Sequence, residues 1–342
     1  LFFFYFKILM VKPQKSQKAI AKKSYKNLNK KPQRRPKKSK KIKVIIVERK
    51  LSDEYMKKKE GEYFGENAYD IIVNSNCDVY YYEDNKKKTL LKFRKSVIPE
   101  KLCKIGLESL KEAAKKTHDN RGAAAGVLSE DKLPSYAKIG KLIGRGKFRA
   151  RAYEASDGKI VKNSLGNLSQ SNIIGYYDKR DRNFKDSPPC RKTAFSAQQV
   201  EKWENVVPLI ESIDKQFKKL IPKNHRIQYT QAHKTDFVIS DTAFSTVTIN
   251  YNWRTALHKD AGDLKEGFGN LVVLEEGKYE GGCTGFPQFK VGVDCRHGDF
   301  LAMDVHEWHC NTKIKPITKD YTRLSLVAYL REKMIKCKGM KV

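Results

Sequence analysis

Alternation of apolar and polar positions predicts a series of strands in the second half of the chain. Residues 244–250 alternate β-branched with polar side chains, which is the pattern of a strand with one buried face. Four more short apolar segments follow, separated by glycine-rich turns at a spacing typical of a barrel: residues 270–275, 291–294, 300–305 and 323–330. We therefore expect the C-terminal part of the chain to be built mainly of strands.

Strands are also predicted near the start of the chain. Residues 44–47 form a short apolar run, and residues 78–83 and 89–93 lie on either side of a polar turn at Asp84-Asn85. The length of these runs and their β-branched and aromatic residues favour strands over helices.

Two helices are expected between these strand regions. Apolar residues at helical spacing, opened by a proline in the first turn, predict a helix over residues 97–116. A longer amphipathic helix is predicted at residues 196–220, where Pro208 should kink it or split it in two. The fold class that follows is α+β, with a mainly β core and flanking helices.

The chain is strongly basic. Its 342 residues carry a formal net charge of +31, and 39% of them are hydrophobic, which is enough for a folded core. A charge of this size attracts polyanions such as nucleic acid, although a basic tail and the lysine-rich usage of an AT-rich genome would also produce it. Residues 1–43 are expected to be a disordered basic arm. Its run at 30–41 could neutralise phosphates, act as a nuclear import signal or only aid solubility, and composition does not separate these roles.

The termini and cysteines bear on location. Residues 1–10 are mostly apolar but too short to cross a bilayer, and no other stretch is long and apolar enough, so no membrane partner is expected. Met10 could be the true start, in which case residues 1–9 are not native. The seven cysteines form no Cys-x-x-Cys pair, which argues against structural zinc. They suggest free thiols in a reducing, intracellular compartment, such as a nucleus or a viral or cytoplasmic DNA site.

His258, Asp260 and His309 have the residue types of a mononuclear non-haem iron site. On an extended strand His258 and Asp260 would point to one face, and His309 would join them from a distant strand. A double-stranded β-helix, which is jelly-roll or cupin-like, would bring such strands together at the mouth of a barrel. His306 is the alternative third ligand. His309 is preferred because it lies just beyond the end of the strand predicted at residues 300–305.

Two further motifs carry charge or polarity. Arg323 and Ser325 share one face of a predicted strand, where a guanidinium and a hydroxyl suit the far carboxylate of a dicarboxylic co-substrate. Residues 144–149, Gly-Arg-Gly-Lys-Phe-Arg, lack the spacing of a phosphate-binding P-loop. They predict instead a basic loop that could touch nucleic acid.

These motifs and their surroundings, over residues 237–333, resemble a known family. The matching stretches are Thr248-Ile249-Asn250-Tyr251-Asn252, His258-Lys259-Asp260-Ala261-Gly262-Asp263, Gly267-Phe268-Gly269-Asn270-Leu271, Gly277-Lys278-Tyr279-Glu280-Gly281-Gly282, Asp304-Val305-His306-Glu307-Trp308-His309-Cys310-Asn311-Thr312 and Thr322-Arg323-Leu324-Ser325-Leu326-Val327-Ala328-Tyr329. They are similar to the iron(II)/2-oxoglutarate dioxygenases of the ten-eleven-translocation and J-binding-protein (TET/JBP-like) group, especially its compact microbial and viral members. Residues 120–126 and 189–195 resemble accessory segments of the same domain, and Cys310 departs from the Gly of many relatives.

The resemblance implies roles for individual residues. Fe(II) would be bound by His258, Asp260 and His309, which would also make them the catalytic residues. The co-substrate 2-oxoglutarate would contact Arg323, Ser325, Asn250 and Asn252, although the two asparagines could instead cap a strand end. Candidate substrate contacts are Asp263, Arg121, Arg191 and Arg331. For Arg121 and Arg191 the alternative is a structural salt bridge, and for Arg331 a solvated charge at a strand end.

The resemblance also implies an activity. The 5-methyl group of a pyrimidine, either 5-methylcytosine or thymine, would be hydroxylated in nucleic acid, with DNA as the preferred partner, while dioxygen is consumed and succinate and CO2 are released. Such an enzyme must take the base out of the stack. The alternatives are a prolyl or lysyl protein hydroxylase and an inactive nucleic-acid-binding protein. In the expected domain plan, residues 44–235 pack on an iron-binding core at 236–333, and a tail follows at 334–342.

Overall fold

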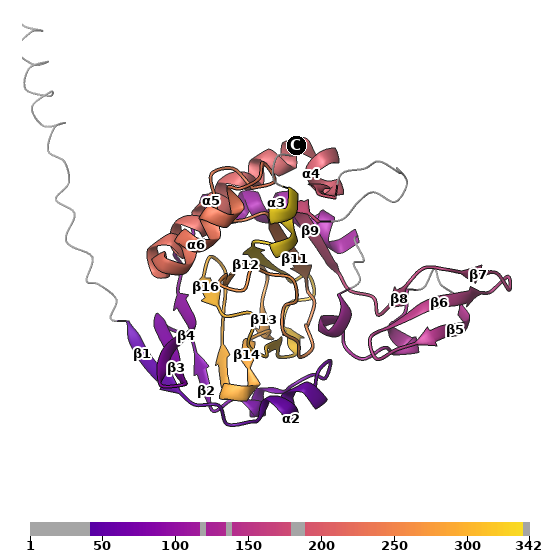
Figure 1. Ribbon diagram of the computed structural model, residues 1–342, viewed down its shortest axis with the longest axis horizontal. Coiled ribbons are helices and arrows are strands. Elements are labelled where there is room, and N and C mark those ends of the chain that lie inside the picture. Colours follow the sequence, from indigo (N-terminus) through magenta and orange to yellow (C-terminus); the bar gives the residue numbers. More distant parts are fainter. Residues whose placement is uncertain (1–41, 117–120, 135–138, 179–188, 338–342) are drawn as a thin grey trace, which may run out of the picture. The chain divides into compact units, whose positions relative to one another are not determined.

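Antiparallel pairing joins strands from both halves of the chain into one large sheet. The computed structural model describes residues 42–116, 121–134, 139–178 and 189–337. Within them the largest sheet has nine strands, in the order β1-β3-β4-β16-β12-β19-β11-β9-β10 (Figure 1). Their bounds are β1 Lys43–Val47, β3 Cys77–Glu83, β4 Lys86–Arg94, β9 Ser171–Tyr177, β10 Arg191–Lys192, β11 Thr246–Tyr251, β12 Gly269–Glu276, β16 Phe300–Met303 and β19 Thr322–Tyr329. The predicted arm and residues 1–9 lie outside the described residues, apart from Ile42 and Lys43.

Smaller sheets complete the strand inventory of the described residues. A four-stranded sheet has the order β17-β14-β15-β2, and β13 pairs with β18. A separate four-stranded unit contains β5, β6, β7 and β8. The bounds are β2 Ile71–Val73, β5 Ile139–Arg145, β6 Arg149–Ala155, β7 Ile160–Val161, β8 Leu165–Gly166, β13 Tyr279–Gly281, β14 Thr284–Phe286, β15 Val291–Val293, β17 Cys310–Asn311 and β18 Ile314–Pro316.

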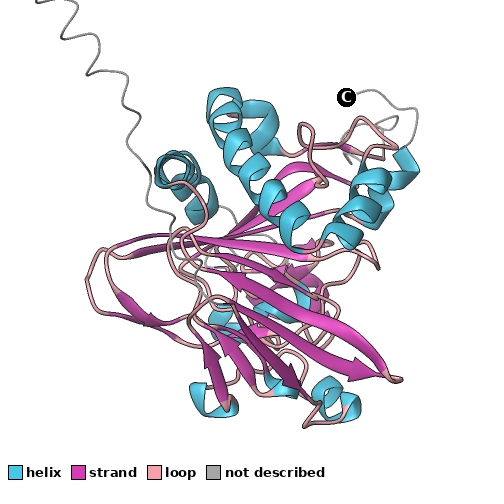
Figure 2. Ribbon diagram, turned by 90° about the vertical axis from the view of Figure 1, so that its left-hand side faces the viewer, coloured by secondary structure: helices cyan, strands magenta, loops and turns pink. Residues whose placement is uncertain are grey.

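The helices gather mainly on one side of the large sheet (Figure 2). The α-helices are α2 Asp53–Lys58, α3 Glu100–Lys116, α4 Ala194–Gln198, α5 Val200–Leu220 and α6 Pro222–Ala232. Short 3-10 helices are η1 Glu66–Ala68, η2 Gly122–Ala125, η3 Glu130–Lys132, η4 Pro287–Phe289 and η5 Glu332–Cys337. Pro208 lies inside α5, so of the two predicted alternatives the split is wrong and the kink stays a prediction, and the helical region breaks instead at Gln199. None of the helices in the described ranges has the length and apolar character needed to cross a membrane.

Strand alternation gives the large sheet two apolar faces, and each packs into its own core. On the outer face, residues of β11, β12 and β19 such as Val247, Val272 and Leu326 pack against α3 and α5. On the inner face, Leu271 and Val273 pack against the four-stranded sheet, including Phe286 and Val291. The polar positions of this inner face, toward one end of the two sheets, are left to line a cavity.

The strand predictions agree closely with the structure, and the sheet-rich α+β class is confirmed. The turn at Asp84-Asn85 has φ values of 48° and 58°, as a two-residue hairpin turn requires. Strands β9, β14 and β17 and the β5–β8 unit were not predicted, because β14 and β17 are only three and two residues long and the others carry no clear apolar–polar period. The region before residue 236 also contributes strands directly to the large sheet, since β4 pairs with β16 and β9 pairs with β11.

The expectation of free thiols is wrong for two cysteines. Cys190 and Cys337 form a disulfide, joining positions 147 residues apart in the sequence. No short sequence spacing between cysteines predicts this pair, because only the fold brings the β10 region beside the C-terminal η5. The other five cysteines are free and buried: Cys77, Cys103, Cys283, Cys295 and Cys310.

Candidate metal centre and cavity

His258 and His309 face each other from two loop segments. They form an isolated antiparallel bridge in which each backbone N–H donates to the carbonyl of the other at 3.0 Å. The prediction that His258 and Asp260 lie on a regular strand is therefore wrong, because this isolated bridge lies outside the named strands. Asp260 is fixed separately, by its own N–H donating to Val305 O at 3.0 Å. Both histidines are buried, with 8% and 5% of their surface exposed.

Backbone carbonyls orient both imidazole rings. His258 Nδ1 lies 2.8 Å from Ala256 O and His309 Nδ1 lies 2.9 Å from Glu307 O. A carbonyl can only accept, so each Nδ1 carries the proton and each Nε2 keeps a free lone pair. These Nε2 atoms point to the Asp260 carboxylate, at 3.4 Å for His258 and 3.9 Å for His309. The rings are thus preset in the tautomer that a metal ligand needs.

The donor set fits a ferrous ion. One ligand atom each from His258, Asp260 and His309 lies within 4.8 Å of the other two, and no other group of this kind occurs among the described residues. Two imidazoles and one carboxylate on one side of an ion leave further positions open, which is the arrangement of non-haem iron oxygenases. His306 is not part of this group, because its Nδ1 pairs with Asp304 at 3.2 Å.

The charges at the centre favour metal binding at neutral pH. Burial alone would raise the pKa of Asp260, but the adjacent His258 and His309 rings, which stabilise the carboxylate when they are protonated, outweigh it and lower that pKa. Burial, reinforced by His258, lowers the pKa of His309 to about 4. An ionised Asp260 beside a neutral His309 is the protonation state that binds a divalent cation.

The shift at His309 predicts a pH dependence of stability for the metal-free protein. The pKa of His309 falls from 6.5 to about 4 on folding, so the unfolded chain binds the extra proton. The free energy of unfolding should therefore decrease as pH falls from 6.5 to about 4. Denaturant titrations at several pH values across that window should show that the free energy of unfolding changes less steeply with pH in His309→Gln than in the unchanged protein. Equal slopes for the two proteins would contradict the shift.

A cavity of about 380 Å³ opens beside the metal centre. This volume lies in the range of small-ligand sites. Its wall follows strand register: Asn250 lies opposite Ser325, and Thr248 lies opposite Val327. Both pairs therefore point to the inner face of the sheet. The lining residues include Arg121, Phe148, Thr248, Asn250, Thr255, His258, Asp260, Asp263, Thr284, His309, Asn311, Ser325, Tyr329 and Arg331.

Unpaired polar atoms lie beside the inner end of this wall. Arg323 precedes Ser325 on the same face of β19 and is only 1% exposed. Its Nη2 donates to Gly282 O at 3.0 Å, whereas its Nε is buried without a partner. Asn250 Nδ2 donates to Ser325 Oγ at 3.4 Å, and Asn250 Oδ1 is also buried without a partner. Buried polar atoms usually find partners, so a guanidinium and an amide left incomplete here fit a carboxylate-bearing ligand.

Asn252 lies differently from the prediction. Its φ of 46° takes the chain out of β11, so it does not continue the face of Asn250. Its Oδ1 accepts from Arg323 N at 2.6 Å and its Nδ2 donates to Tyr321 O at 3.1 Å. Asn252 therefore ties the ends of two strands together and does not line the cavity.

Three of the four predicted substrate residues meet at the cavity. Asp263 and Arg331 form an isolated bridge, and Arg331 Nε pairs with Asp178, so the reading of Arg331 as a solvated charge is wrong. Burial, reinforced by Asp260, raises the pKa of Asp263 well above its ordinary value. Arg121 also lines the cavity, and its Nε is buried without a partner. Arg191 lies elsewhere, on β10, with its guanidinium 4.8 Å from the centre of the Tyr177 ring.

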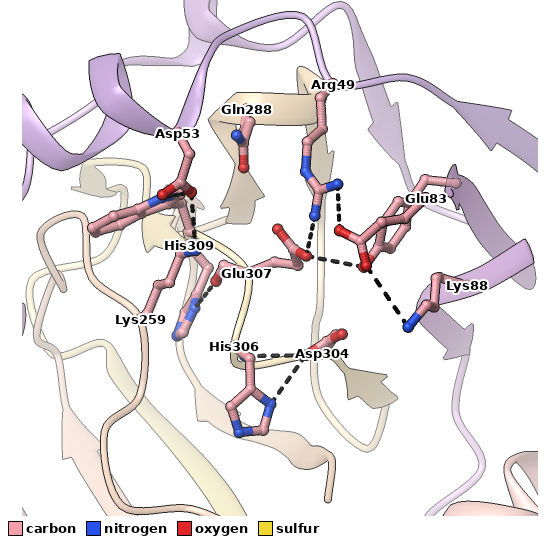
Figure 3. A network of polar contacts seen from close by, with 12 residues as sticks. Arg49, Asp53, Glu83, Lys88, Lys259, Gln288, Asp304, His306, Glu307 and His309 are labelled. Atoms are coloured by element: carbon pink, nitrogen blue, oxygen red, sulfur yellow. Dashed lines mark hydrogen bonds and ion pairs between the residues drawn. The ribbon is translucent and has the colours of Figure 1, made fainter. Parts of the chain in front are cut away.

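An acidic side chain from the N-terminal part of the described chain holds both ligand loops (Figure 3). Asp53, at the start of α2, accepts a hydrogen bond from Trp308 Nε1 at 2.7 Å and one from Lys259 Nζ at 3.0 Å. Trp308 adjoins His309, and Lys259 lies between His258 and Asp260. A single carboxylate thus joins the loops that carry all three ligand atoms.

A second contact fastens the loop before His309. The Glu307 carboxylate accepts from Arg49 Nη2 at 2.6 Å and from Tyr81 Oη at 2.9 Å. The backbone carbonyl of Glu307 is the group that orients the His309 ring. The sequence did not predict these supporting contacts, because each residue lies far from its partner along the chain: Arg49, Asp53, Tyr81 and Glu307. Thr248 could have been found, since it precedes Asn250 by two positions on one strand.

Removing the Asp53 contact should loosen the centre. Groups that orient metal ligands typically contribute tenfold to hundredfold in metal affinity. For Asp53→Ala we expect about a tenfold weaker Fe(II) affinity, measured by anaerobic titration. Glu83→Ala is the matched control, because Glu83 pairs with Arg49 at 2.8 Å but touches neither ligand loop. Equal affinities for the two variants would contradict the role of Asp53.

Comparisons with known proteins agree with this geometry. Residues 172–332 match the Tet_JBP family, described as the oxygenase domain of the 2OGFeDO superfamily. Thymine dioxygenase JBP1-B of Trypanosoma cruzi is 34% identical over 220 residues, covering 62% of this chain and 25% of that protein. Bifunctional helicase and thymine dioxygenase JBP2 of Leishmania major is 34% identical over 162 residues, or 46% of this chain and 14% of that protein.

The chain therefore spans about a quarter of the first of these relatives and less of the second. Among solved structures, NgTET1 in complex with 5mC DNA aligns with a TM-score of 0.48 and 13% identity, covering 89% of this chain and 85% of that chain. The matched region contains His258, Asp260, His309 and Arg323. Residues 172–332 of this chain thus match an oxygenase domain of the Tet_JBP family, within the superfamily of dioxygenases that use Fe(II) and 2-oxoglutarate.

Proposed function

We propose that this chain hydroxylates the 5-methyl group of a pyrimidine in DNA. The observation that carries the proposal is the convergence of His258 Nε2, His309 Nε2 and the Asp260 carboxylate on the wall of the cavity. The curated relatives are thymine dioxygenases, which makes thymine the first substrate to test and 5-methylcytosine the second.

We assign the co-substrate to the inner end of the cavity. Bound Fe(II) and 2-oxoglutarate would supply the oxidising chemistry, with succinate and CO2 as by-products. Arg323 would neutralise the far carboxylate, Ser325 and Asn250 would supply hydrogen bonds, and His258, Asp260 and His309 would hold the metal. The unpaired Arg323 Nε and Asn250 Oδ1 support this assignment. Because the inner core is apolar and packed on one side, water would be excluded there.

The substrate base would enter from the side of Asp263, Arg331 and Arg121. A methylated pyrimidine presents hydrogen-bonding groups on one edge and an apolar methyl group at C5. Asp263 and Arg331 offer an acceptor and a donor on adjacent backbone positions, held together by their bridge. A base reaches such a pocket only when it leaves the stack, so the protein must also hold the flanking backbone.

The two facing sheets correspond, in this proposal, to the halves of a double-stranded β-helix. The large sheet and the β17-β14-β15-β2 sheet enclose an apolar core between them and leave the cavity at one end. Residues 236–333 supply the metal ligands and β11 to β19, while β3, β4 and β9 widen the sheet from the 44–235 region. Such a barrel mouth is where inward-facing polar residues and open metal positions can meet.

Product identity tests the function directly. Purified protein with Fe(II) and 2-oxoglutarate is incubated with DNA that contains thymine alone, with DNA that also contains 5-methylcytosine, and with proline- and lysine-containing peptides. We expect succinate release to rise with DNA, and nucleoside mass spectrometry to find 5-hydroxymethyluracil or 5-hydroxymethylcytosine. Turnover stimulated only by the peptides would overturn the proposal.

A further inference from the structure

The β5–β8 unit stands apart from both sheets as a basic ribbon. We call residues 139–166 the ribbon; in Figure 1 its β5, β6 and β7 project from the side of the body. It makes its own four-stranded sheet and pairs with no strand of the other sheets among the described residues. Ile143 and Ile160 are exposed, at 36% and 52%, so the ribbon has little core of its own. A projecting sheet of this kind is held by its root and is free to meet a partner.

The ribbon carries a large excess of positive charge. Residues 139–166 contain seven basic and two acidic residues, a difference of five positive charges: Lys141, Arg145, Lys147, Arg149, Arg151, Lys159 and Lys162 against Glu154 and Asp157. Arg145 pairs with Glu130, and Lys159 pairs with Asp157. Arg149 and Arg151 are exposed, and no carboxylate of the described residues lies within ion-pair distance of either. Their charges remain available to an anionic partner.

Alternation places these two arginines on one face of the ribbon. Arg149 and Arg151 are two positions apart on β6, so their side chains point the same way. On the neighbouring strand β5, Gly144 lies directly beside Arg151, whose side chain would come within 3.2 Å of an added Cβ. Gly146 likewise lies beside Arg149. The face is therefore flat as well as basic, and a polyanion can approach its backbone closely.

The root of the ribbon lies at the cavity. Phe148, in the turn between β5 and β6, lines the cavity together with Arg121 and His258. Lys147 O accepts from Leu128 N at 2.8 Å, and Lys147 Nζ donates to Lys58 O at 3.5 Å, which fixes this turn to the body. The charged face of β6 thus starts at the mouth of the cavity and runs outward. A polymer whose residue enters the cavity can therefore continue along this surface.

We propose that the ribbon binds the phosphate backbone of duplex DNA beside the base that enters the cavity. This inference rests on the proposed function and assigns the surface that holds the rest of the substrate. A seven-residue strand such as β6 spans about 20 Å, which is the axial length of roughly six base pairs. Phosphate contacts of this kind position the duplex without reading its sequence.

Duplex binding by the full chain tests the ribbon. Affinity is measured by fluorescence anisotropy over a series of salt concentrations, without Fe(II) or 2-oxoglutarate. For Arg149→Ala combined with Arg151→Ala, we expect about tenfold weaker binding and a slope of log affinity against log salt that is smaller by about two. Arg149→Lys with Arg151→Lys keeps both charges and should restore most of the slope. Lys218→Ala with Lys219→Ala on α5 is the matched control, with the same change of charge at exposed positions outside the cavity wall.

Each outcome decides the proposal. A loss confined to the β6 double alanine variant supports the ribbon as a backbone-binding surface. An unchanged slope in that variant, or an equal loss in the α5 control, would overturn it, because net charge alone would then explain binding. The measurement does not depend on turnover. If the ribbon binds DNA but no methyl group is oxidised in the nucleoside assay, the proposed function fails and the binding surface remains.

Discussion

Replacing His309 by alanine is expected to abolish turnover, and the same change at His306 is expected to leave it nearly intact. His309 Nε2 is one of three atoms that meet within 4.8 Å, and its ring is oriented by Glu307 O. Changing a group that orients a metal ligand typically lowers metal affinity or activity tenfold to hundredfold. Losing the ligand itself should therefore lower turnover about a thousandfold or more. Succinate release per enzyme, with Fe(II) affinity measured in parallel, checks the prediction.

His306→Ala is a strict control because it removes the same side chain three residues away. His306 pairs with Asp304 through Nδ1, its Nε2 is buried without a partner among the described residues, and it is not one of the three residues of the metal group. We expect its Fe(II) affinity to stay within about threefold of the unchanged protein, since no ligand atom and no orienting carbonyl is altered. If the His306 variant lost metal and the His309 variant kept it, the assignment of the third ligand would be reversed.

Replacing Arg323 by glutamine is expected to raise the KM for 2-oxoglutarate about a hundredfold. Loss of one partner of a buried charge pair costs about 2–5 kcal/mol, and about 3 kcal/mol corresponds to that factor. Arg323 is 1% exposed and its Nε is buried without a partner among the described residues, so a bound carboxylate would complete its hydrogen bonds. Initial rates at varied 2-oxoglutarate give the KM, and Fe(II) titration shows whether the metal centre is still assembled.

The control for Arg323 must be another buried arginine, since burial alone makes substitution risky. Arg94 lies on β4 of the same sheet, is 8% exposed and pairs with Asp78 at 2.7 Å. Arg94→Gln should lower the melting temperature while leaving the KM for 2-oxoglutarate unchanged. A normal KM in Arg323→Gln, with Fe(II) binding retained, would exclude Arg323 as the carboxylate partner.

The centre could be predicted from sequence because its chemistry is concentrated in three short motifs. The ligands are two of the seven histidines and one aspartate at a recognisable spacing, and Ser325 lies two positions after Arg323 on a clearly alternating strand. The same alternation places Asn250 opposite Ser325. For Asn252 the argument failed, because β11 ends at Tyr251 and the positive φ of Asn252 turns the chain out of the strand.

The supports of the centre could not be predicted in this way. Asp53 reaches Trp308 over 255 positions, and Cys190 reaches Cys337 over 147, so each contact exists only once the sheets have assembled. The histidines lie in loops joined by one bridge, where no period marks the backbone. The basic residues at 144–149 indicated a loop. That they form the turn between β5 and β6 of a ribbon rooted at the cavity depends on the docking of Phe148.

The most direct test uses labelled dioxygen. The purified protein, Fe(II), 2-oxoglutarate and duplex DNA containing thymine and 5-methylcytosine are reacted under ¹⁸O₂, and the nucleosides are analysed by mass spectrometry. We predict a 5-hydroxymethylpyrimidine carrying one ¹⁸O atom, in proportion to the succinate formed, and none with Asp260→Ala. Unmodified nucleosides from a protein that binds Fe(II) and 2-oxoglutarate, or the same product from Asp260→Ala, would contradict the account.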